Sequence, residues 1–307
     1  MNSRVCIAVP TYRRQDQLFA VLHGLARLRI DADLDVEIVV FDNDAARSGE
    51  HVVTSLPVDY PIPVRYEVVP EPGLSSVRNG ELTWAYAHAE YLAMIDDDEI
   101  PEPQWLHELM RVRRKTGADV VVGPVPVILP DEAPGWFGAW RSAEMPHPAD
   151  GSPLRDGWTG NCLLHLPTMR TFDVSFDPTM NFSGGEDTLF FRQIRARGGT
   201  IAYAARATVW ELMSADRVSL GFVVARHFRK GNTLARCDQR IHGDPVAIAV
   251  RVAKGCGLTA IGSFTALACA LTLRNAEFVR SACDVARGVG MIAGLCGVSY
   301  EPYRRQI

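Results

Sequence analysis

The chain has 307 residues, of which 47% are hydrophobic and 22% charged, so it can bury a substantial core and is not a disordered protein. Its 32 Lys and Arg against 36 Asp and Glu leave a formal net charge of −4. This charge argues against a nucleic-acid-binding protein, because phosphate binding needs a positive excess. The seven cysteines include no C-x-x-C pair, so neither a zinc site nor a disulfide framework is expected, and a reducing compartment is favoured.

The first half of the chain alternates short β-rich runs with amphipathic stretches, which predicts an α/β fold with a mostly parallel sheet flanked by helices. In such sheets ligands bind outside the carboxyl ends of the strands. Residues 130–153 are rich in proline, tryptophan and glycine, and we expect an irregular loop there. Strands are expected at residues 5–9, 36–41, 64–69, 91–95 and 118–129, and helices at 15–28, 75–90, 101–116 and 188–196.

The character of the chain changes near residue 245. Residues 255–273 carry no charge over almost the length of a membrane span, although glycine and alanine make the run only mildly apolar. A buried helical hairpin, an interfacial membrane element and a true span are all open, and Gly290-x-x-x-Gly294 predicts close helix packing in each case. Residues 5–9 follow Arg4 as a strand and not as a signal peptide, so we expect the catalytic part in the cytoplasm.

The acidic run 96–99, Asp-Asp-Asp-Glu, directly follows the expected strand 91–95. Adjacent carboxylates repel one another, and a sequence tolerates them best where a cation binds. Asp96 and Asp98 point the same way in an extended segment, so they can hold one Mg²⁺ or Mn²⁺, ions that share oxygen ligands with substrate phosphates. The alternative is that the run only complements the dipole of the helix expected at 101–116.

A second candidate is the run Gly184-Gly-Glu-Asp187, which precedes the expected helix 188–196. Ser183 and Glu186 have the spacing of a capping box, so Glu186 can be purely structural. The two glycines let a substrate approach the backbone, and Asp187 could take a proton from an attacking hydroxyl.

Several further polar or aromatic groups each have a structural alternative. Asp42-Asn-Asp44 is either an Asx turn or a recognition site for a base or ribose. Arg78 could reach a pyrophosphate or be a surface residue. The basic segment 226–231 could neutralise a diphosphate, contact anionic lipid or be a solvated helix face. The aromatic residues that could stack on a sugar or pack in the core are Trp136, Phe137, Trp140 and Trp158.

Taken in order, these pieces resemble family 2 glycosyltransferases with the GT-A fold, in particular bacterial members that assemble exopolysaccharide and other cell-surface glycans. The resemblance spans about residues 4–235, and no single motif carries it. The matching pieces are Val9-Pro-Thr-Tyr-Arg13, Phe41-Asp-Asn-Asp44, Pro72-Gly-Leu-Ser-Ser-Val-Arg-Asn79, the run 91–101, Gly160-Asn161, Gly185-Glu-Asp-Thr188, Trp210-Glu211 with Arg217, and Arg226-x-x-Arg229-x-Gly231.

The resemblance implies a role for each matching position. It implies a catalytic domain over residues 1–240, with a nucleotide-sugar half at 1–130 and an acceptor half at 131–240, followed by an apolar helical region at 241–307. It implies that Asp96 and Asp98 hold Mn²⁺ or Mg²⁺ against a diphosphate, with Glu211 near a position where relatives have histidine, and that Asp187 is the catalytic base. The donor site would comprise Pro10, Thr11, Tyr12, Arg13, Asp42, Arg78, Asp96 and Asp97; the acceptor site Trp158, Asn161, Gly185 and Glu186; and the diphosphate contacts Arg226 and Arg229.

The resemblance further implies an inverting hexosyltransferase that moves one sugar, most often from a UDP-sugar, to a glycan or lipid-linked saccharide at the inner face of the cell membrane. The Q-x-x-R-W motif of processive synthases is absent, which favours one transfer per acceptor. Two rival functions stay open at this point: a sugar nucleotidyltransferase, although the loop 10–14 lacks the glycines that hold a triphosphate, and a non-catalytic, membrane-attached subunit of glycan assembly.

Overall fold

The computed structural model describes residues 2–144, 148–241, 243, 245–272 and 275–306. The chain folds into two compact units. The sheet unit comprises the described residues within Met1–Val127, His147–Asn181 and Leu189–Leu212. The helical unit comprises those within Ile128–Pro146, Phe182–Thr188 and Met213–Ile307. The predicted boundary at residue 240 stays a prediction.

The sheet unit is built on seven strands in the order β3-β2-β1-β4-β8-β6-β9. All neighbouring pairs are parallel except those of β8, which runs antiparallel to β4 and β6. This confirms the predicted α/β fold with a mostly parallel sheet. The strands are β1 (Ser3–Thr11), β2 (Leu34–Asp42), β3 (Val64–Val68), β4 (Tyr91–Ile95), β6 (Val120–Val122), β8 (Asn161–His165) and β9 (Ile201–Tyr203).

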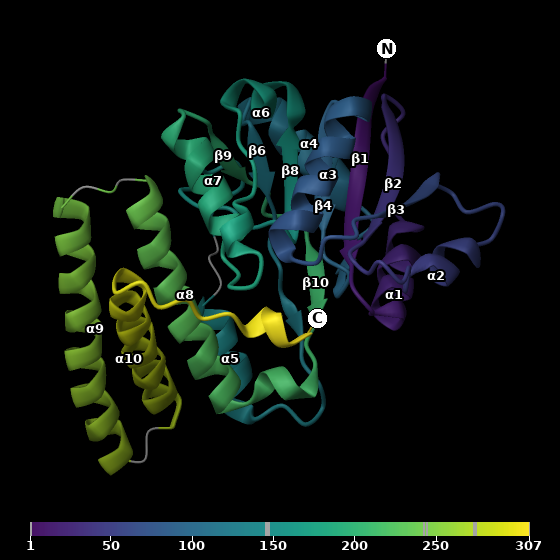
Figure 1. Cartoon of the computed structure of the whole chain (residues 1–307). Coiled ribbons are helices and arrows are strands. Elements are labelled where there is room, and N and C mark those ends of the chain that lie inside the picture. The colour runs from purple at the N-terminus through teal and green to yellow at the C-terminus, as the bar shows by residue number, and fades with distance from the viewer. Residues whose placement is uncertain (1, 145–147, 242, 244, 273–274, 307) are drawn as a thin grey trace. The chain divides into compact units, whose positions relative to one another are not determined.

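Helices cover both faces of this sheet (Figure 1). Alternate residues of β1 point to opposite faces, so Ile7 packs in the core formed with α1 and α4, while Cys6 packs in the core formed with α3, α6 and α7. Both residues are fully or almost fully buried. The helices are α1 (Gln15–Leu25), α2 (Glu50–Thr54), α3 (Leu74–His88), α4 (Trp105–Thr116), α6 (Leu166–Phe172) and α7 (Glu186–Ala196), with a short 3-10 turn at η1 (Pro178–Met180).

Three sequence-based expectations for the middle of the chain are wrong in detail. The helix expected at 101–116 begins only at Trp105, because β5 (Glu99–Pro101) pairs antiparallel with β10 (Val209–Leu212). The strand expected at 118–129 is two strands, β6 and β7 (Val127–Ile128). Pro124 and Pro126 lie between them and cannot donate a ladder hydrogen bond.

The loop expected at 130–153 contains the helix α5 (Gly135–Glu144), which buries Phe137 and Trp140. Two buried aromatic rings three residues apart share one face of a helix, and this period was masked by the surrounding prolines and glycines. Residues 145–147 of that expected loop lie outside the described residues.

The helical unit contains α5, a 3-10 turn at η2 (Ala215–Val218), α8 (Leu220–Ile241), α9 (Pro245–Leu271), α10 (Asn275–Leu295) and a final turn, η3 (Pro302–Gln306). α10 packs against both α8 and α9. The predicted close packing at Gly290 and Gly294 is confirmed, since a Cβ added there would lie 2.0 Å from the Phe228 carbonyl oxygen and 2.7 Å from that of Asn232.

The helical hairpin expected for the apolar C-terminal run is present, but its first helix is not buried. α9 buries only Gly255 and Gly262, whereas Phe264 and Leu271 are 75% and 78% exposed. Residue 273, the end of the expected run, lies outside the described residues. Within the described parts of the chain, α9 is the single helix whose length and composition would allow it to cross a membrane.

Candidate functional site

Strands β1, β2 and β4 end side by side at the carboxyl edge of the sheet unit, where the register pairs Thr11 with Asp42. The acidic run follows β4 directly after Ile95. The loop 12–14 follows β1 before α1 begins at Gln15. Parallel strand order therefore gathers polar residues from distant parts of the sequence at one edge, where open α/β sheets bind their ligands.

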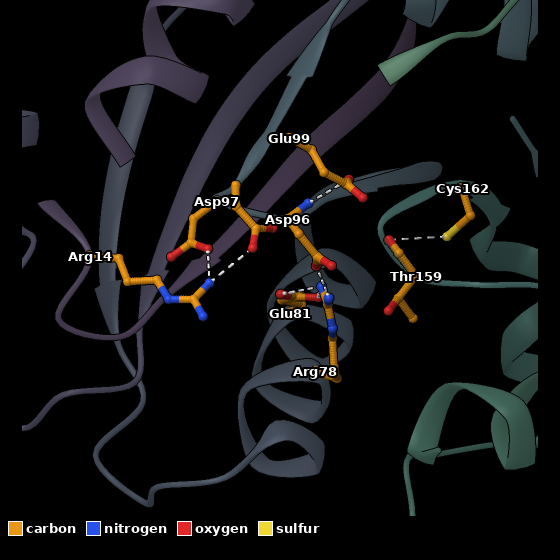
Figure 2. A network of polar contacts seen from close by, with 9 residues as sticks. Arg14, Arg78, Glu81, Asp96, Asp97, Glu99, Thr159 and Cys162 are labelled. Atoms are coloured by element: carbon orange, nitrogen blue, oxygen red, sulfur yellow. Dashed lines mark hydrogen bonds and ion pairs between the residues drawn. The ribbon is translucent and has the colours of Figure 1, made fainter. Parts of the chain in front are cut away.

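Asp97 is held between two groups of the β1 segment. Its Oδ2 accepts a hydrogen bond from Thr11 Oγ1 at 3.0 Å, and its Oδ1 lies 3.0 Å from Arg14 Nη1. The same nitrogen of Arg14 lies 3.3 Å from Oδ2 of Asp98 (Figure 2 shows Arg14 pointing toward Asp97). Burial raises the pKa of Asp97 to about 6, and the charge of Arg14 opposes that rise. The guanidinium of Arg14 thus holds the two neighbouring carboxylates of Asp97 and Asp98 in place.

Asp96 is held by a second arginine, from α3. Arg78 forms an ion pair with Asp96, and its Nη1 lies 3.2 Å from both carboxylate oxygens of Glu81 (Figure 2). Arg78 and Glu81 are almost completely buried. Burial raises the pKa of Glu81 to about 7, against the lowering effect of Arg78. The buried pair fixes the guanidinium of Arg78 beneath the acidic run.

Glu99 is the fourth acid of the run and is buried at the start of β5. Its Oε2 accepts a hydrogen bond from the backbone nitrogen of Asp96 at 3.2 Å. Burial, followed by the charges of Asp96 and Asp98, raises the pKa of Glu99 well above its usual range. A Cβ on Gly160 would lie 2.5 Å from Oε1 of Glu99, so this position has room for no side chain.

Glu211 lies opposite Glu99 in the pairing of β10 with β5, so the two side chains share a face of that small sheet. The structure thus brings Glu211, which the resemblance placed near a metal-binding position, beside the acidic run; its predicted role at the metal stays a prediction. Across the described residues, however, no three His, Cys, Asp or Glu side chains gather closely enough to hold a metal by themselves. Asp96 and Asp98 are oxygen donors of the kind that Mg²⁺ and Mn²⁺ prefer, and such ions commonly take one or two carboxylates and complete their coordination with substrate phosphates and water. By donor chemistry the residues present fit that arrangement. The expected extended segment is instead a turn at residues 96–99, which places Asp96 at Arg78 and Asp98 beside Asp97 at Arg14.

Asp42 ends β2 and is fully buried. Its Oδ2 accepts hydrogen bonds from Tyr66 Oη and the Gly49 nitrogen, both at 2.6 Å, and its Oδ1 accepts one from the Asp44 nitrogen at 2.9 Å. Asp42 therefore organises the turn after β2. Its predicted contact with a nucleotide base stays a prediction.

The two residues after Asp42 tie that turn to its surroundings. Asp44 pairs with Arg13 at 3.0 Å, and this hydrogen bond lowers the pKa of Asp44. Asn43 Nδ2 donates to the carbonyl oxygens of Val69 and Glu71, and its Oδ1 accepts from the Gly73 nitrogen at 2.8 Å. Since α3 begins directly after Gly73, Asn43 helps to position the helix that carries Arg78.

Asn161, expected near an acceptor, is fully buried and structurally engaged. Its Oδ1 accepts from Trp105 Nε1 at 2.8 Å, and its Nδ2 donates to the carbonyl oxygens of Pro124 and Ala207. Trp158 Nε1 donates to the Gly123 carbonyl at 3.0 Å, and its ring lies edge-on to Tyr203. This geometry gives Asn161 a structural role, and acceptor binding at Trp158 stays a prediction.

Of the other predicted residues, Pro10 lies in β1 and Tyr12 directly follows that strand, whereas those near positions 185 and 229 belong to the helical unit. Gly184 and Gly185 have φ of +70° and +86°, and a Cβ on Gly185 would lie 2.1 Å from the side chain of Thr233 on α8. These glycines let the loop lie directly on α8, so the space that was expected for a substrate beside them is filled by protein side chains. Glu186 and Asp187 form the first turn of α7, and Asp187 Oδ1 accepts a hydrogen bond from the Thr188 nitrogen.

Two basic residues on α8 were expected to contact a diphosphate. Arg229 Nη1 donates to Tyr303 Oη at 2.7 Å, and a Cβ on Gly184 would lie 3.8 Å from that nitrogen, so Arg229 lies beside the loop that carries Asp187. Arg226 is exposed on the same helix. Within their own unit, Arg229 and the Gly184–Asp187 loop are therefore brought together.

Sequence reasoning missed three residues that shape this site. Glu81 could have been found, because its i,i+3 spacing from Arg78 predicts an ion pair on one helix. Glu99 was read only as part of an acidic run. Arg14 carried no sequence signal, since its partners lie 83 and 84 residues away in the chain.

These features define a nucleotide-sugar enzyme of the GT-A fold, and comparison with known proteins identifies its family. The family model described as glycosyl transferase family 2 matches residues 6–173. The chain belongs to this family and is a glycosyltransferase. It is 34% identical over 299 residues to the succinoglycan biosynthesis protein ExoM of Rhizobium meliloti (strain 1021), which covers 95% of this chain and 93% of that relative.

Two solved structures have the same fold at low sequence identity. The mannosyltransferase PcManGT from Pyrobaculum calidifontis, in complex with GDP-Man and Mn²⁺, matches with a TM-score of 0.65 and 15% identity, over 96% of this chain and 88% of that one. S. aureus TarS 1-349, in complex with UDP-GlcNAc, matches with a TM-score of 0.53 and 13% identity, over 98% of this chain and 93% of that one. These likenesses confirm the predicted GT-A fold.

Proposed function

We propose that this glycosyltransferase moves a single sugar from a UDP-sugar to a lipid-linked saccharide during exopolysaccharide synthesis, with inversion and with a divalent metal. The similarity to the succinoglycan biosynthesis protein ExoM supports the pathway. The complex of TarS with UDP-GlcNAc supports the donor, and the Mn²⁺ in the mannosyltransferase complex supports the metal. The exposed apolar face of α9 is consistent with work at the cytoplasmic surface of the membrane.

The observation that carries this proposal is the acidic run at the end of β4, with Arg14 and Arg78 on either side. Burial, and after it the charges of Asp96 and Asp98, raise the pKa values of Asp97 and Glu99, and two arginines compensate only part of the acidic charge of the run. A bound divalent ion would supply further positive charge against the leaving diphosphate. Asp96 and Asp98 would hold it.

In this mechanism the protein's own residues position and neutralise charge on the donor side. Arg14 orients Asp97 and Asp98, and Arg78 orients Asp96, so the carboxylates need no rearrangement when a donor binds. Thr11 holds Asp97 from the end of β1. A preorganised site of this kind lowers the energy of the charge that develops on the departing nucleoside diphosphate.

Asp187 acts on the acceptor side. Its carboxylate accepts the proton of the acceptor hydroxyl while the oxygen forms a bond to the anomeric carbon and the bond from that carbon to the diphosphate breaks. Attack from the face opposite the leaving group inverts the configuration at this carbon. Gly184 and Gly185 let the loop that carries Asp187 lie directly on α8, which holds this carboxylate in place.

The test is transfer from a panel of UDP-sugars to a membrane lipid extract, after chelation and with added Mn²⁺. We expect chelation or Asp98→Asn to lower transfer by about 100-fold or more, because charge stabilisation by the metal is worth several kcal/mol. Asp33→Asn is the matched control, since Asp33 pairs only with Arg114 at the surface, far along the chain from the acidic run.

A transfer rate that the chelator leaves unchanged would remove the metal from the proposal. Release of pyrophosphate from a nucleoside triphosphate, in place of UDP from a sugar donor, would show nucleotidyl transfer.

A further inference from the structure

An apolar groove of about 800 Å³ runs between α8, α9 and α10 in the helical unit. Of its eleven lining residues, only Ser263 and Tyr300 have polar side chains. The walls include Val224 and Phe228 of α8, Ala266 of α9, and Val285 and Val289 of α10. Its volume lies within the range of pockets that bind small molecules.

The lining restricts what the groove can bind. A saccharide or a peptide backbone would bury donors and acceptors that have almost no partners here, and each unpaired polar group costs free energy. A hydrocarbon chain has no such groups, and each buried CH₂ contributes roughly 0.8 kcal/mol. The small side chains on α9 and α10 leave the length of the groove open. Its chemistry therefore favours a long hydrocarbon chain.

The groove leads toward the loop that carries Asp187. Tyr300 lines the groove and packs edge-on against Phe228, with ring centroids 5.6 Å apart. Three residues later, Tyr303 accepts a hydrogen bond from Arg229, and its nitrogen donates to the Phe182 carbonyl oxygen at 3.3 Å. Three residues span at most about 10 Å. The aromatic end of the groove therefore lies close to Arg229 and to the Gly184–Asp187 loop.

Arg229 is suited to an anion at this junction. It directly follows Phe228 on α8, and a guanidinium has five N–H donors in a geometry that matches phosphate. A molecule with a hydrocarbon chain, a phosphate and a saccharide, joined in that order, would meet groove, Arg229 and Asp187 in the same order.

We propose that this groove binds the hydrocarbon chain of the lipid-linked acceptor, with the phosphate of that lipid at Arg229 and its terminal sugar at Asp187. This inference rests on the proposed function and specifies how its acceptor is recognised. The helical unit is then the acceptor-lipid site of the enzyme, and the chain length of the acceptor contributes directly to binding.

The test uses farnesyl diphosphate, whose fifteen-carbon chain carries a diphosphate, and isopentenyl diphosphate, which has the same diphosphate on five carbons. Binding is measured by titration calorimetry with the whole protein. We expect farnesyl diphosphate to bind at least 10-fold more tightly than isopentenyl diphosphate, because ten more carbons are buried. Equal binding of the two would overturn the proposal.

Two variants change the groove. Val289→Asp places a charge in a wall residue that is 42% exposed, and Ser263→Phe fills the groove from an exposed position, so both changes are compatible with folding. Each variant should bind farnesyl diphosphate at least 10-fold more weakly than the unchanged protein. Ile261→Asp is the matched control, because this 68% exposed residue of α9 does not line the groove. This variant should bind farnesyl diphosphate as tightly as the unchanged protein does. Farnesyl diphosphate binding that survives both groove variants would contradict the assignment.

Other occupants give different results. Soluble dihexanoyl phosphatidylglycerol that binds as tightly as farnesyl diphosphate would assign the groove to a bilayer lipid and overturn the acceptor assignment. A dimer that Val289→Asp converts to a monomer, in a protein that does not bind farnesyl diphosphate, would assign it to a second copy. A thermal shift with UDP is recorded in parallel. UDP binding without farnesyl diphosphate binding refutes only this inference. Farnesyl diphosphate binding without UDP binding counts against the proposed donor.

Discussion

Large side chains fill the interior of the sheet unit, whereas glycines bring backbones together in the helical unit. Between the sheet and its helices lie fully buried groups such as Leu22 of α1 and Phe190 of α7. Where α8 meets α10, by contrast, Gly231 and Gly290 face carbonyl oxygens of the opposite helix. The two units should therefore respond to opposite kinds of substitution: the first to lost atoms, the second to added atoms.

The comparison extends to function. Under the proposed mechanism the sheet unit binds the donor, through the acidic run and its arginines, and the helical unit binds the acceptor, through the groove and the loop of Asp187. Carboxylates held by arginines suit the first task, and an apolar groove beside a cationic side chain suits the second. The predictions below test this division.

The largest expected effect is on catalysis. Asp187→Asn should lower transfer by about 100-fold or more, because a general base is lost, while binding of the UDP-sugar stays unchanged. The measurement compares initial rates with the thermal shift that the donor produces. Near-normal turnover in this variant would remove Asp187 from its proposed role, and a lost donor shift would break the division between the units.

Leu22→Ala probes the filled core of the sheet unit. Leu22 is fully buried, so its truncation should lower the free energy of unfolding by about 2–5 kcal/mol, as measured by chemical denaturation. Phe19→Ala on the same helix is the control, because Phe19 is 58% exposed and its loss should cost less than about 0.5 kcal/mol. Equal losses in the two variants would show that α1 is not packed as described.

Glu81 should make the stability of the sheet unit depend on pH. Its pKa in the folded protein, about 7, lies above the value of an unfolded glutamate, so the folded state binds more protons and stability falls as pH rises from about 4 toward 7. Glu81→Gln should reduce the loss of unfolding free energy between pH 5 and pH 8 by up to about 3 kcal/mol. Glu37→Gln, at the surface pair with Arg65, should leave this slope as it is. An unchanged slope in Glu81→Gln would contradict the buried position of the carboxyl.

Gly290→Ala tests the helical unit by adding a side-chain atom where Leu22→Ala removes several. The added Cβ would lie 2.0 Å from the Phe228 carbonyl oxygen, so the helices must separate, at a cost of about 1–3 kcal/mol in unfolding free energy. Gly257→Ala on α9 is the matched control, since nothing lies within 4 Å of its added Cβ. Alanine there should stabilise the helix by about 0.5–1 kcal/mol. If both changes stabilise, the crossing of α8 and α10 is looser than described.

Much of the fold was predictable from local pattern. The strand at residues 91–95 was predicted with its observed bounds, since a fully apolar run followed by acids shows both its burial and its end. Chain order alone also indicated that Asp96–Asp98 lie at the carboxyl edge of the sheet. The helix α5 was missed, because the prolines and glycines around it outweighed the spacing of Phe137 and Trp140 in a reading by composition.

The sequence by itself determined the α/β fold, the place of the acidic run and the family, because hydrophobic period and motif order are local properties. Only the tertiary structure decided which arginine meets which carboxylate, that the amide of Asn161 serves the core, and that three helices leave an apolar groove open. The physical reason is that such contacts join groups far apart in the chain, as Arg14 and Asp97 are. Their geometry depends on strand order and helix packing, which no short stretch of sequence encodes.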